Sequence, residues 1–115
     1  MRRTSKPSAS APAEPLAVQR GRFATPVDRA EVERDWAARG HSCEMWVDPP
    51  GREWNDFVHE TQELVTLIEG RLSFTVGGET VVLEPGDELV IPRAAVHSVR
   101  NIHPRASRWL FGYGG

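Results

Sequence analysis

Residues 72–92, LSFTVGGETVVLEPGDELVIP, decide the class of fold. Apolar and polar residues alternate in LSFTV, which is the period of a half-buried β-strand. Gly77-Gly78 is a typical hairpin dipeptide, and ETVVLE at 79–84 returns as a second strand. Pro85-Gly86 ends that strand, and ELVIP at 88–92 begins a third. The segment therefore predicts an antiparallel all-β architecture.

The same pattern continues on both sides of this segment. Strands are predicted at HSCEMWV (41–47), WNDFVHE (54–60), ELVTLIE (63–69), VHSVRN (96–101) and SRWLFGY (107–113). Short strands at regular spacing, with Gly and Pro between them, are typical of a β-sandwich or a β-barrel. Period two turns one set of apolar residues inward, and the predicted core residues are Val65, Leu67, Leu72, Phe74, Val76 and Val99.

The N-terminal part of the chain has a different character. Residues 1–15 are rich in Ser, Ala and Pro and are predicted to be disordered, whereas LAVQRGRFA at 16–24 is predicted as an edge strand. A helix is then predicted with Thr25 as its cap, and Val32 and Trp36 share one of its faces. We therefore expect a tail at 1–15, a strand and a helix at 16–40, and a barrel at 41–115.

Length and composition exclude several classes of protein. The 115 residues, 39% of them hydrophobic and 26% charged, suit a single globular domain. The net charge of −2 disfavours nucleic acid as a partner. Five basic residues and one acidic residue lie within 1–22, so this arm carries +4 and the remainder −6. The arm is either a solvated tail or a contact for an acidic partner.

The same survey addresses location. The sequence has no apolar run of about 18 residues, and its N-terminus lacks the apolar segment of a secretory signal. We therefore expect no membrane span and a cytoplasmic location. A single cysteine, Cys43, excludes a disulfide within the chain and fits a reducing compartment.

Three residues are candidate metal ligands: His59, Glu63 and His97. A small bend between strands would bring His59 beside Glu63, and His97 begins a later strand after the Pro92 turn. Two imidazoles and one carboxylate on a concave wall would form a facial ligand set with open positions for substrate or dioxygen. Taken alone, such residues in a β-protein are more often ordinary core or surface residues.

The spacing of these residues resembles the two signature motifs of the cupin family. His59 stands four positions before Glu63, and six residues separate Glu63 from Gly70, as in the first motif. The second motif is matched at every expected offset by Gly86, Pro92, His97 and Asn101. Both motifs together cover residues 51–101. The resemblance implies an antiparallel jelly-roll β-barrel, here with one short N-terminal helix.

Three positions depart from the family pattern, and the first is Gly51, which is displaced from the place of the leading glycine of the first motif. Phe57 stands where the first motif has its first His, and Ala94 replaces the glycine of Pro-x-Gly. The resemblance implies a ligand set of three His and one Glu, of which this chain keeps His59, Glu63 and His97. Three ligands can still hold Fe, Mn, Ni or Zn as a divalent ion. The alternative is a barrel that has lost its metal and holds a ligand by shape.

Aromatic residues near the predicted barrel mouth are candidate substrate contacts. These residues are Trp46, Trp54, Phe57, Trp109 and Phe111, with Tyr113 following in the same pattern. Several of them around one cavity would favour a substrate with an apolar or aromatic part, although each is individually more often a core or dimer contact. Arg93, directly after Pro92, is a candidate partner for a substrate carboxylate, with a solvated turn residue as the alternative.

These residues support two main functional hypotheses. The first is a metal-dependent enzyme of the dioxygenase, decarboxylase or isomerase type that acts on a small organic molecule. The second is a non-catalytic sensor or binding module for a small molecule; a structural or storage role fits the short chain less well. Apolar residues predicted on outer strand faces, Leu64, Val82 and Val90, favour a homodimer.

Overall fold

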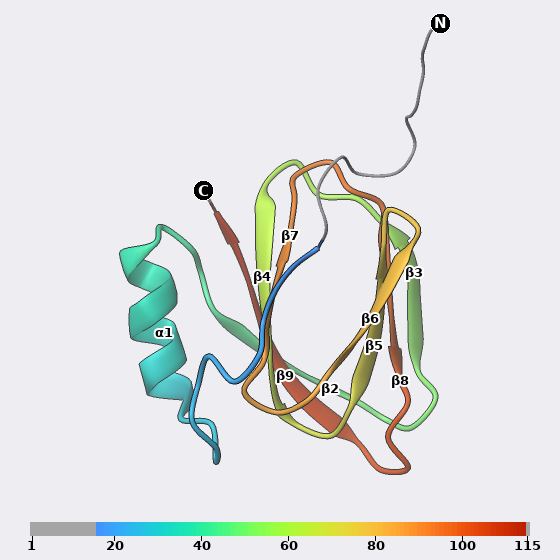
Figure 1. Cartoon of the computed structure of the whole chain (residues 1–115), viewed down its shortest axis with the longest axis horizontal. Coiled ribbons are helices and arrows are strands. Elements are labelled where there is room, and N and C mark those ends of the chain that lie inside the picture. Colours follow the sequence, from blue (N-terminus) through green and yellow to red (C-terminus); the bar gives the residue numbers. More distant parts are fainter. Residues whose placement is uncertain (1–15, 115) are drawn as a thin grey trace, which may run out of the picture.

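Two antiparallel sheets face each other and form a barrel (Figure 1). The computed structural model describes residues 16–114. One sheet has the order β1-β7-β4-β9-β2 and the other β3-β8-β5-β6. The strands are β1 (Ala17–Gln19), β2 (Glu44–Asp48), β3 (Glu53–Phe57), β4 (Gln62–Glu69), β5 (Leu72–Val76), β6 (Glu79–Leu83), β7 (Glu88–Ile91), β8 (His97–Asn101) and β9 (Ser107–Gly114). The predicted all-β, jelly-roll class is confirmed.

The core between the sheets is the one that period two predicts. Side chains pointing inward from both sheets are almost fully buried, and they include all six predicted core residues: Val65, Leu67, Leu72, Phe74, Val76 and Val99. Burial of each such side chain stabilises the fold by about 1.5–3 kcal/mol relative to its exposure to water. The hairpin between β5 and β6 turns at Gly77 and Gly78, as predicted.

One helix, α1 (Arg29–Ala38), covers the outer face of the five-stranded sheet (Figure 1). The predicted face is correct, because Val32 and Trp36 are fully buried. The predicted cap is wrong. Asp28, not Thr25, caps the helix, and its carboxylate accepts a hydrogen bond from the amide of Ala30. Asp and Ser/Thr caps are similarly favoured, so the sequence offers competing starts.

The position of α1 also corrects the surface predicted for a homodimer. Leu64 is fully buried and Val90 partly buried, and both pack in the cluster that contains Val32 and Trp36. Their outward direction is therefore explained by the helix of the same chain, whereas Val82 on β6 is half-buried. The homodimer stays a prediction, without the support of Leu64 and Val90.

The N-terminal strand belongs to the same sheet as the rest of the barrel. The edge strand predicted within 16–24 forms as β1, which pairs with β7, so the strand assigned to the 16–40 segment completes the barrel wall. Just after it, Arg20 forms an ion pair with Asp87. The tail predicted at 1–15 lies outside the described residues. Within residues 16–114, no helix has the length and apolar character needed to cross a membrane.

Candidate metal centre

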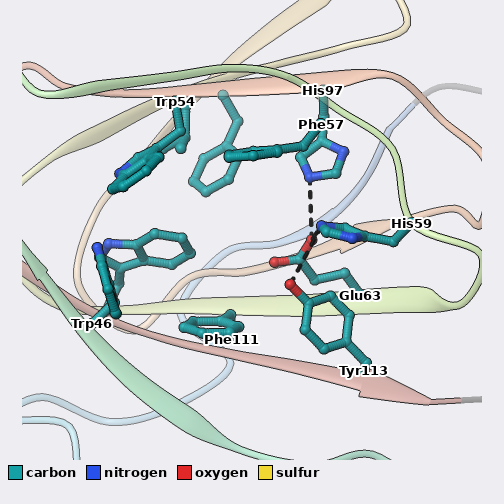
Figure 2. A pocket seen from close by; sticks show the side chains of 11 residues that line it. Trp46, Trp54, Phe57, His59, Glu63, His97, Phe111 and Tyr113 are labelled. Carbon is teal, nitrogen blue, oxygen red and sulfur yellow. Dashed lines mark hydrogen bonds and ion pairs between the residues drawn. The ribbon is translucent and has the colours of Figure 1, made fainter.

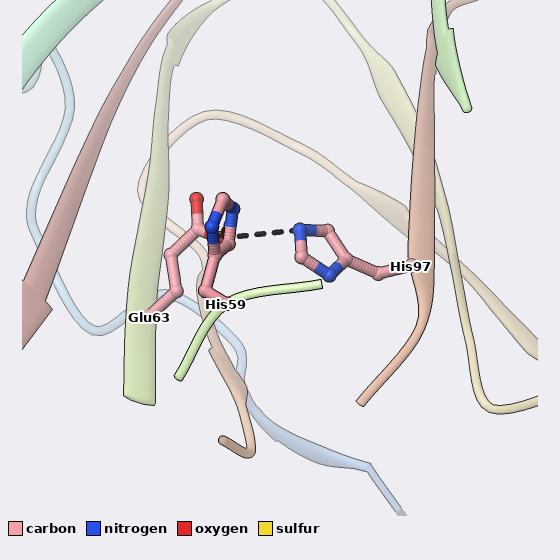
Figure 3. A group of neighbouring side chains, drawn as sticks. All are labelled: His59, Glu63 and His97. Atoms are coloured by element: carbon pink, nitrogen blue, oxygen red, sulfur yellow. Dashed lines mark ion pairs between the residues drawn. The ribbon is translucent and has the colours of Figure 1, made fainter. Parts of the chain in front are cut away.

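His59, Glu63 and His97 converge inside the barrel (Figure 3). Nε2 of His97 lies 3.2 Å and Nε2 of His59 lies 3.6 Å from Oε1 of Glu63. One ligand atom from each residue lies within 4.8 Å of the others. At metal–ligand distances of about 2.0–2.2 Å, adjacent ligand atoms are about 3 Å apart, so small side-chain movements would let the three share one ion.

The two sheets and one loop each supply a candidate ligand. Glu63 is the second residue of β4, in the five-stranded sheet, and His97 begins β8 in the four-stranded sheet. His59 was predicted on a strand, but β3 ends at Phe57 and His59 lies in the following loop. Its carbonyl accepts a hydrogen bond of 2.8 Å from the amide of Ala94, which ties this loop to the turn before His97.

A β-bulge explains why β3 ends before His59. The register between β3 and β8 shifts between Trp54 and Phe57, and Asp56 has a φ of 59°, in the left-handed region. A bulge of this kind re-aims the side chains that follow it. The Phe57 ring consequently lies 6.1 Å from the rings of both His59 and His97. Phe57 thus adjoins the candidate ligands, where the cupin pattern has a further His.

The electrostatics of the cluster suit a cation. The side chain of Glu63 is 5% exposed, and its Oε1 has no hydrogen-bond partner among the described residues, although two imidazoles lie within ion-pair distance. Burial lowers the pKa of His97, but the Glu63 carboxylate and the Ala95 carbonyl outweigh it, so the pKa is raised overall. A buried carboxylate oxygen without a donor is costly unless a proton or a metal ion satisfies it.

A second contact orients the ring of His97. Its Nδ1 lies 3.1 Å from the carbonyl oxygen of Ala95, and an Nδ1–H donor there leaves Nε2 free to face Glu63. Metal-binding histidines generally have their other ring nitrogen held in this way. Among the described residues, His59, Glu63 and His97 therefore fit a divalent ion with N and O ligands.

Tyr113, the last residue of the aromatic pattern predicted near the barrel mouth, lies beside the three candidate ligands, a role that the sequence did not assign to it. Its hydroxyl is 3.3 Å from Nε2 of His59 (Figure 2), and burial raises its pKa to about 12, with a smaller contribution from the charge of Glu63. The phenol is therefore a neutral donor at ordinary pH. The alternation Trp109, Phe111, Tyr113 along β9 was the available signal, since it places all three on one face.

An aromatic cavity of about 260 Å³ opens onto the cluster (Figure 2). All five predicted aromatic contacts line it: Trp46, Trp54, Phe57, Trp109 and Phe111. Trp46 and Trp54 stand at the end opposite His59, Glu63 and His97. Arg93 is not part of this lining; it is exposed in the turn after β7, where its guanidinium can remain hydrated. The predicted carboxylate contact at Arg93 is therefore not supported by its position.

Sequence reasoning also missed Asp48, which links three of the aromatic side chains. Its carboxylate accepts hydrogen bonds from the indole N–H groups of Trp46 at 3.1 Å, Trp54 at 2.9 Å and Trp109 at 3.0 Å. Asp48 is only 1% exposed. The side-chain amide of Asn101, the last residue of the second motif, donates to the carbonyl of Asp48 and fixes its backbone. No local sequence pattern reveals these contacts, because they join β2, β3 and β9.

Comparison with known proteins identifies the family. A family model described as "Cupin domain" matches residues 44–113. The chain belongs to the cupin family. No curated protein sequence is significantly similar to this cupin.

Similar solved structures share the fold. The Cnp3 cupin domain of Schizosaccharomyces pombe has a TM-score of 0.62 and 18% identity, covering 65% of this cupin and 56% of that chain. TT1209 from Thermus thermophilus has a TM-score of 0.60 and 26% identity, covering 65% and 72%. A salicylate dioxygenase mutant from Pseudoaminobacter salicylatoxidans, in complex with gentisate, has a TM-score of 0.59 and 21% identity, covering 65% and 20%. The match thus spans little more than half of the first relative and a fifth of the dioxygenase.

Proposed function

We propose that this cupin binds a divalent metal ion through His59, Glu63 and His97 and uses it to transform a small organic molecule held in the aromatic cavity. The observation that carries the proposal is the buried Oε1 of Glu63, which lacks a hydrogen-bond partner and faces two imidazole nitrogens. A metal ion is the usual occupant of such a set. Fe, Mn, Ni and Zn all suit these N and O donors.

The chain contributes position, exclusion of water and a hydrogen-bond donor. When bound, the ion would supply Lewis acidity or a site for dioxygen, as in dioxygenase, decarboxylase or isomerase reactions. The aromatic walls exclude water from the substrate and strengthen electrostatic interactions within the cavity. The Tyr113 hydroxyl, beside His59, can donate a hydrogen bond to a substrate oxygen at this end.

A non-catalytic binding function is the second candidate, and Phe57 favours it. Its ring contacts both imidazoles at a position where a further ligand would strengthen metal binding. With three ligands, affinity for the ion is lower, and shape and aromatic contacts would then hold the small molecule. This candidate predicts ligand binding that is unchanged after treatment with a chelator.

Metal analysis of protein purified without a polyhistidine tag tests the first candidate. We expect a stoichiometric divalent metal in the wild type and its loss in His97→Ala, with the fold retained by circular dichroism. His103→Ala is the matched control, because His103 lies outside the cavity lining and should keep the metal. Unchanged metal content in His97→Ala would show that the site assignment is wrong.

A further inference from the structure

The buried carboxylate of Asp48 lies behind the indole rings at the end of the cavity farthest from the histidines, and it does not itself line the cavity. Asp48 accepts three indole N–H donors and donates none, as an ionised carboxylate does. No ion pair of residues 16–114 includes Asp48. Within the same residues, no Lys or Arg side chain lines the cavity. A buried carboxylate in this position favours a positive charge nearby.

The indole rings that bond to Asp48 also line the cavity, so their faces are where a cation would be attracted. Trp46, Trp54 and Trp109 line the cavity and share Asp48 as acceptor. The face of an indole ring is already electron-rich, and a carboxylate bonded to its N–H group makes the ring more so. The guanidinium of Arg52 lies over the Trp54 ring, 5.0 Å from its centroid, as cation–π attraction favours. Arg52 itself is exposed to water and does not line the cavity.

The size and lining of this end restrict the cation further. A cavity of about 260 Å³ is below the ~300–1,000 Å³ of pockets for drug-sized ligands, so the occupant is small. A primary ammonium group would need hydrogen-bond acceptors, yet the carboxylate oxygens of Asp48 are already bonded to indoles. A cation surrounded by methyl groups needs no acceptor and binds aromatic faces well.

We propose that the indole end of the cavity, formed by Trp46, Trp54 and Trp109 around Asp48, binds a small organic cation of the quaternary ammonium type. The inference deepens the proposed function, because it assigns a substrate class to the same cavity. It gives the aromatic walls a chemical preference: a methylated cation is selected over a neutral molecule of equal shape, and an anion is disfavoured.

Titration calorimetry of the full chain with a matched pair of ligands tests this preference. The two probes are choline and 3,3-dimethylbutan-1-ol. The second is a neutral isostere of choline that has a tert-butyl group in place of the trimethylammonium group. We expect choline to bind about tenfold more tightly, as desolvated cation–π contacts allow. Equal affinities for the two probes, or no binding of either, would overturn the inference.

Two variants locate the preference at Asp48. Asp48→Asn removes the negative charge and should lower the ratio of the two affinities severalfold, leaving only the preference of the indole faces themselves. Glu53→Gln is the control, since Glu53 is an exposed acid on β3 that should leave the ratio unchanged. If Asp48→Asn does not fold, Trp46→Leu, at a half-exposed ring, should weaken choline binding several times more than isostere binding. If the ratio of choline affinity to isostere affinity is unchanged in a folded variant, the cation does not bind at the indole end of the cavity.

Titrations with and without a chelator separate this inference from the proposed metal function. The preference for choline should persist in metal-free protein, because Asp48 and the indoles do not contact the candidate ligands. A protein that binds no metal but prefers choline would refute only the metal function. A protein that binds metal but has no preference would refute only the present inference.

Discussion

Replacing Ala94 with glycine should stabilise the protein. Ala94 has a φ of 65°, in the left-handed region, and it stands where the second cupin motif has a glycine. An L-residue in this conformation costs about 1–2 kcal/mol, a cost that glycine avoids. Glycine also has more conformational freedom than alanine in the unfolded chain, and this lowers the stability of the folded protein by about 0.4–1 kcal/mol. The side chain of Ala94 is exposed, so almost no buried contact is lost.

The difference between these two ranges is an expected net gain of about 0–1.6 kcal/mol in the free energy of unfolding. Its midpoint, about 0.8 kcal/mol, corresponds to about 3–6 °C in melting temperature for a domain of this size. Urea denaturation of metal-free protein measures this gain, with an unchanged dependence on urea concentration as the sign that only stability has changed. Ala95→Gly is the matched control. Ala95 packs partly buried against the core, outside the left-handed region, and its replacement should destabilise the protein by about 0.5–1 kcal/mol.

The same variant probes the candidate metal centre. The amide of Ala94 donates to the carbonyl of His59, and glycine retains that amide in a conformation it favours. Metal affinity should therefore stay within about twofold of the wild type. A destabilising effect of Ala94→Gly on unfolding would refute the argument that this turn is strained.

Three other substitutions or conditions give distinct expectations. Phe57→His should tighten binding of a divalent metal by about 10- to 100-fold in competition with a chelator. Val58→His, at an exposed neighbouring position, should not change the metal affinity. Equal effects of the two substitutions would show that position 57 does not contribute to the metal site. In metal-free protein the raised pKa of His97 stabilises the fold fully below pH 6.5, and this contribution is lost as pH rises through the raised pKa. Metal binding needs neutral His97, so metal affinity should rise over the same pH range, and pH-independent affinity would contradict the ligand role. Gly86→Ala should destabilise the protein by about 2 kcal/mol or more in urea, because Gly86 has a φ of 91° and a Cβ there would collide with the Phe23 carbonyl; a neutral result would refute this close approach.

Most of the barrel was predictable because its signal is local. Strand alternation and hairpin glycines appear within a few residues of each other, and the inward residues around Phe74 follow from period two alone. The grouping of His59, Glu63 and His97 required more than alternation. Their convergence was inferred from motif spacing, and the structure brings the three together although His59 lies in a loop rather than on a strand.

The parts that escaped prediction depend on contacts between distant segments. Asp56 adopts a positive φ, which Asp tolerates better than most residues, but an Asp within a predicted strand does not by itself indicate the bulge that ends β3. The burial of Leu64 depends on which face α1 covers, which the apolar stripe of a helix does not specify. The bonds to Asp48 depend on three strands meeting at one point.

At each end of the cavity, side-chain contacts link the five-stranded sheet to the four-stranded sheet. β2 and β3 are edge strands of different sheets, and Asp48 on β2 joins them through Trp54, while Glu63 and His97 join the two sheets at the other end. Each junction buries a carboxylate, which costs free energy unless donors or cations satisfy it. Asp48 has three N–H donors, whereas Oε1 of Glu63 makes no hydrogen bond of good geometry among the described residues and faces two imidazole nitrogens that donate only when protonated. A metal ion should therefore raise stability by linking the sheets at Glu63, by an amount that grows with the logarithm of its concentration relative to its Kd. The Asp48 junction is complete without metal and should hold the aromatic wall in place in the metal-free protein.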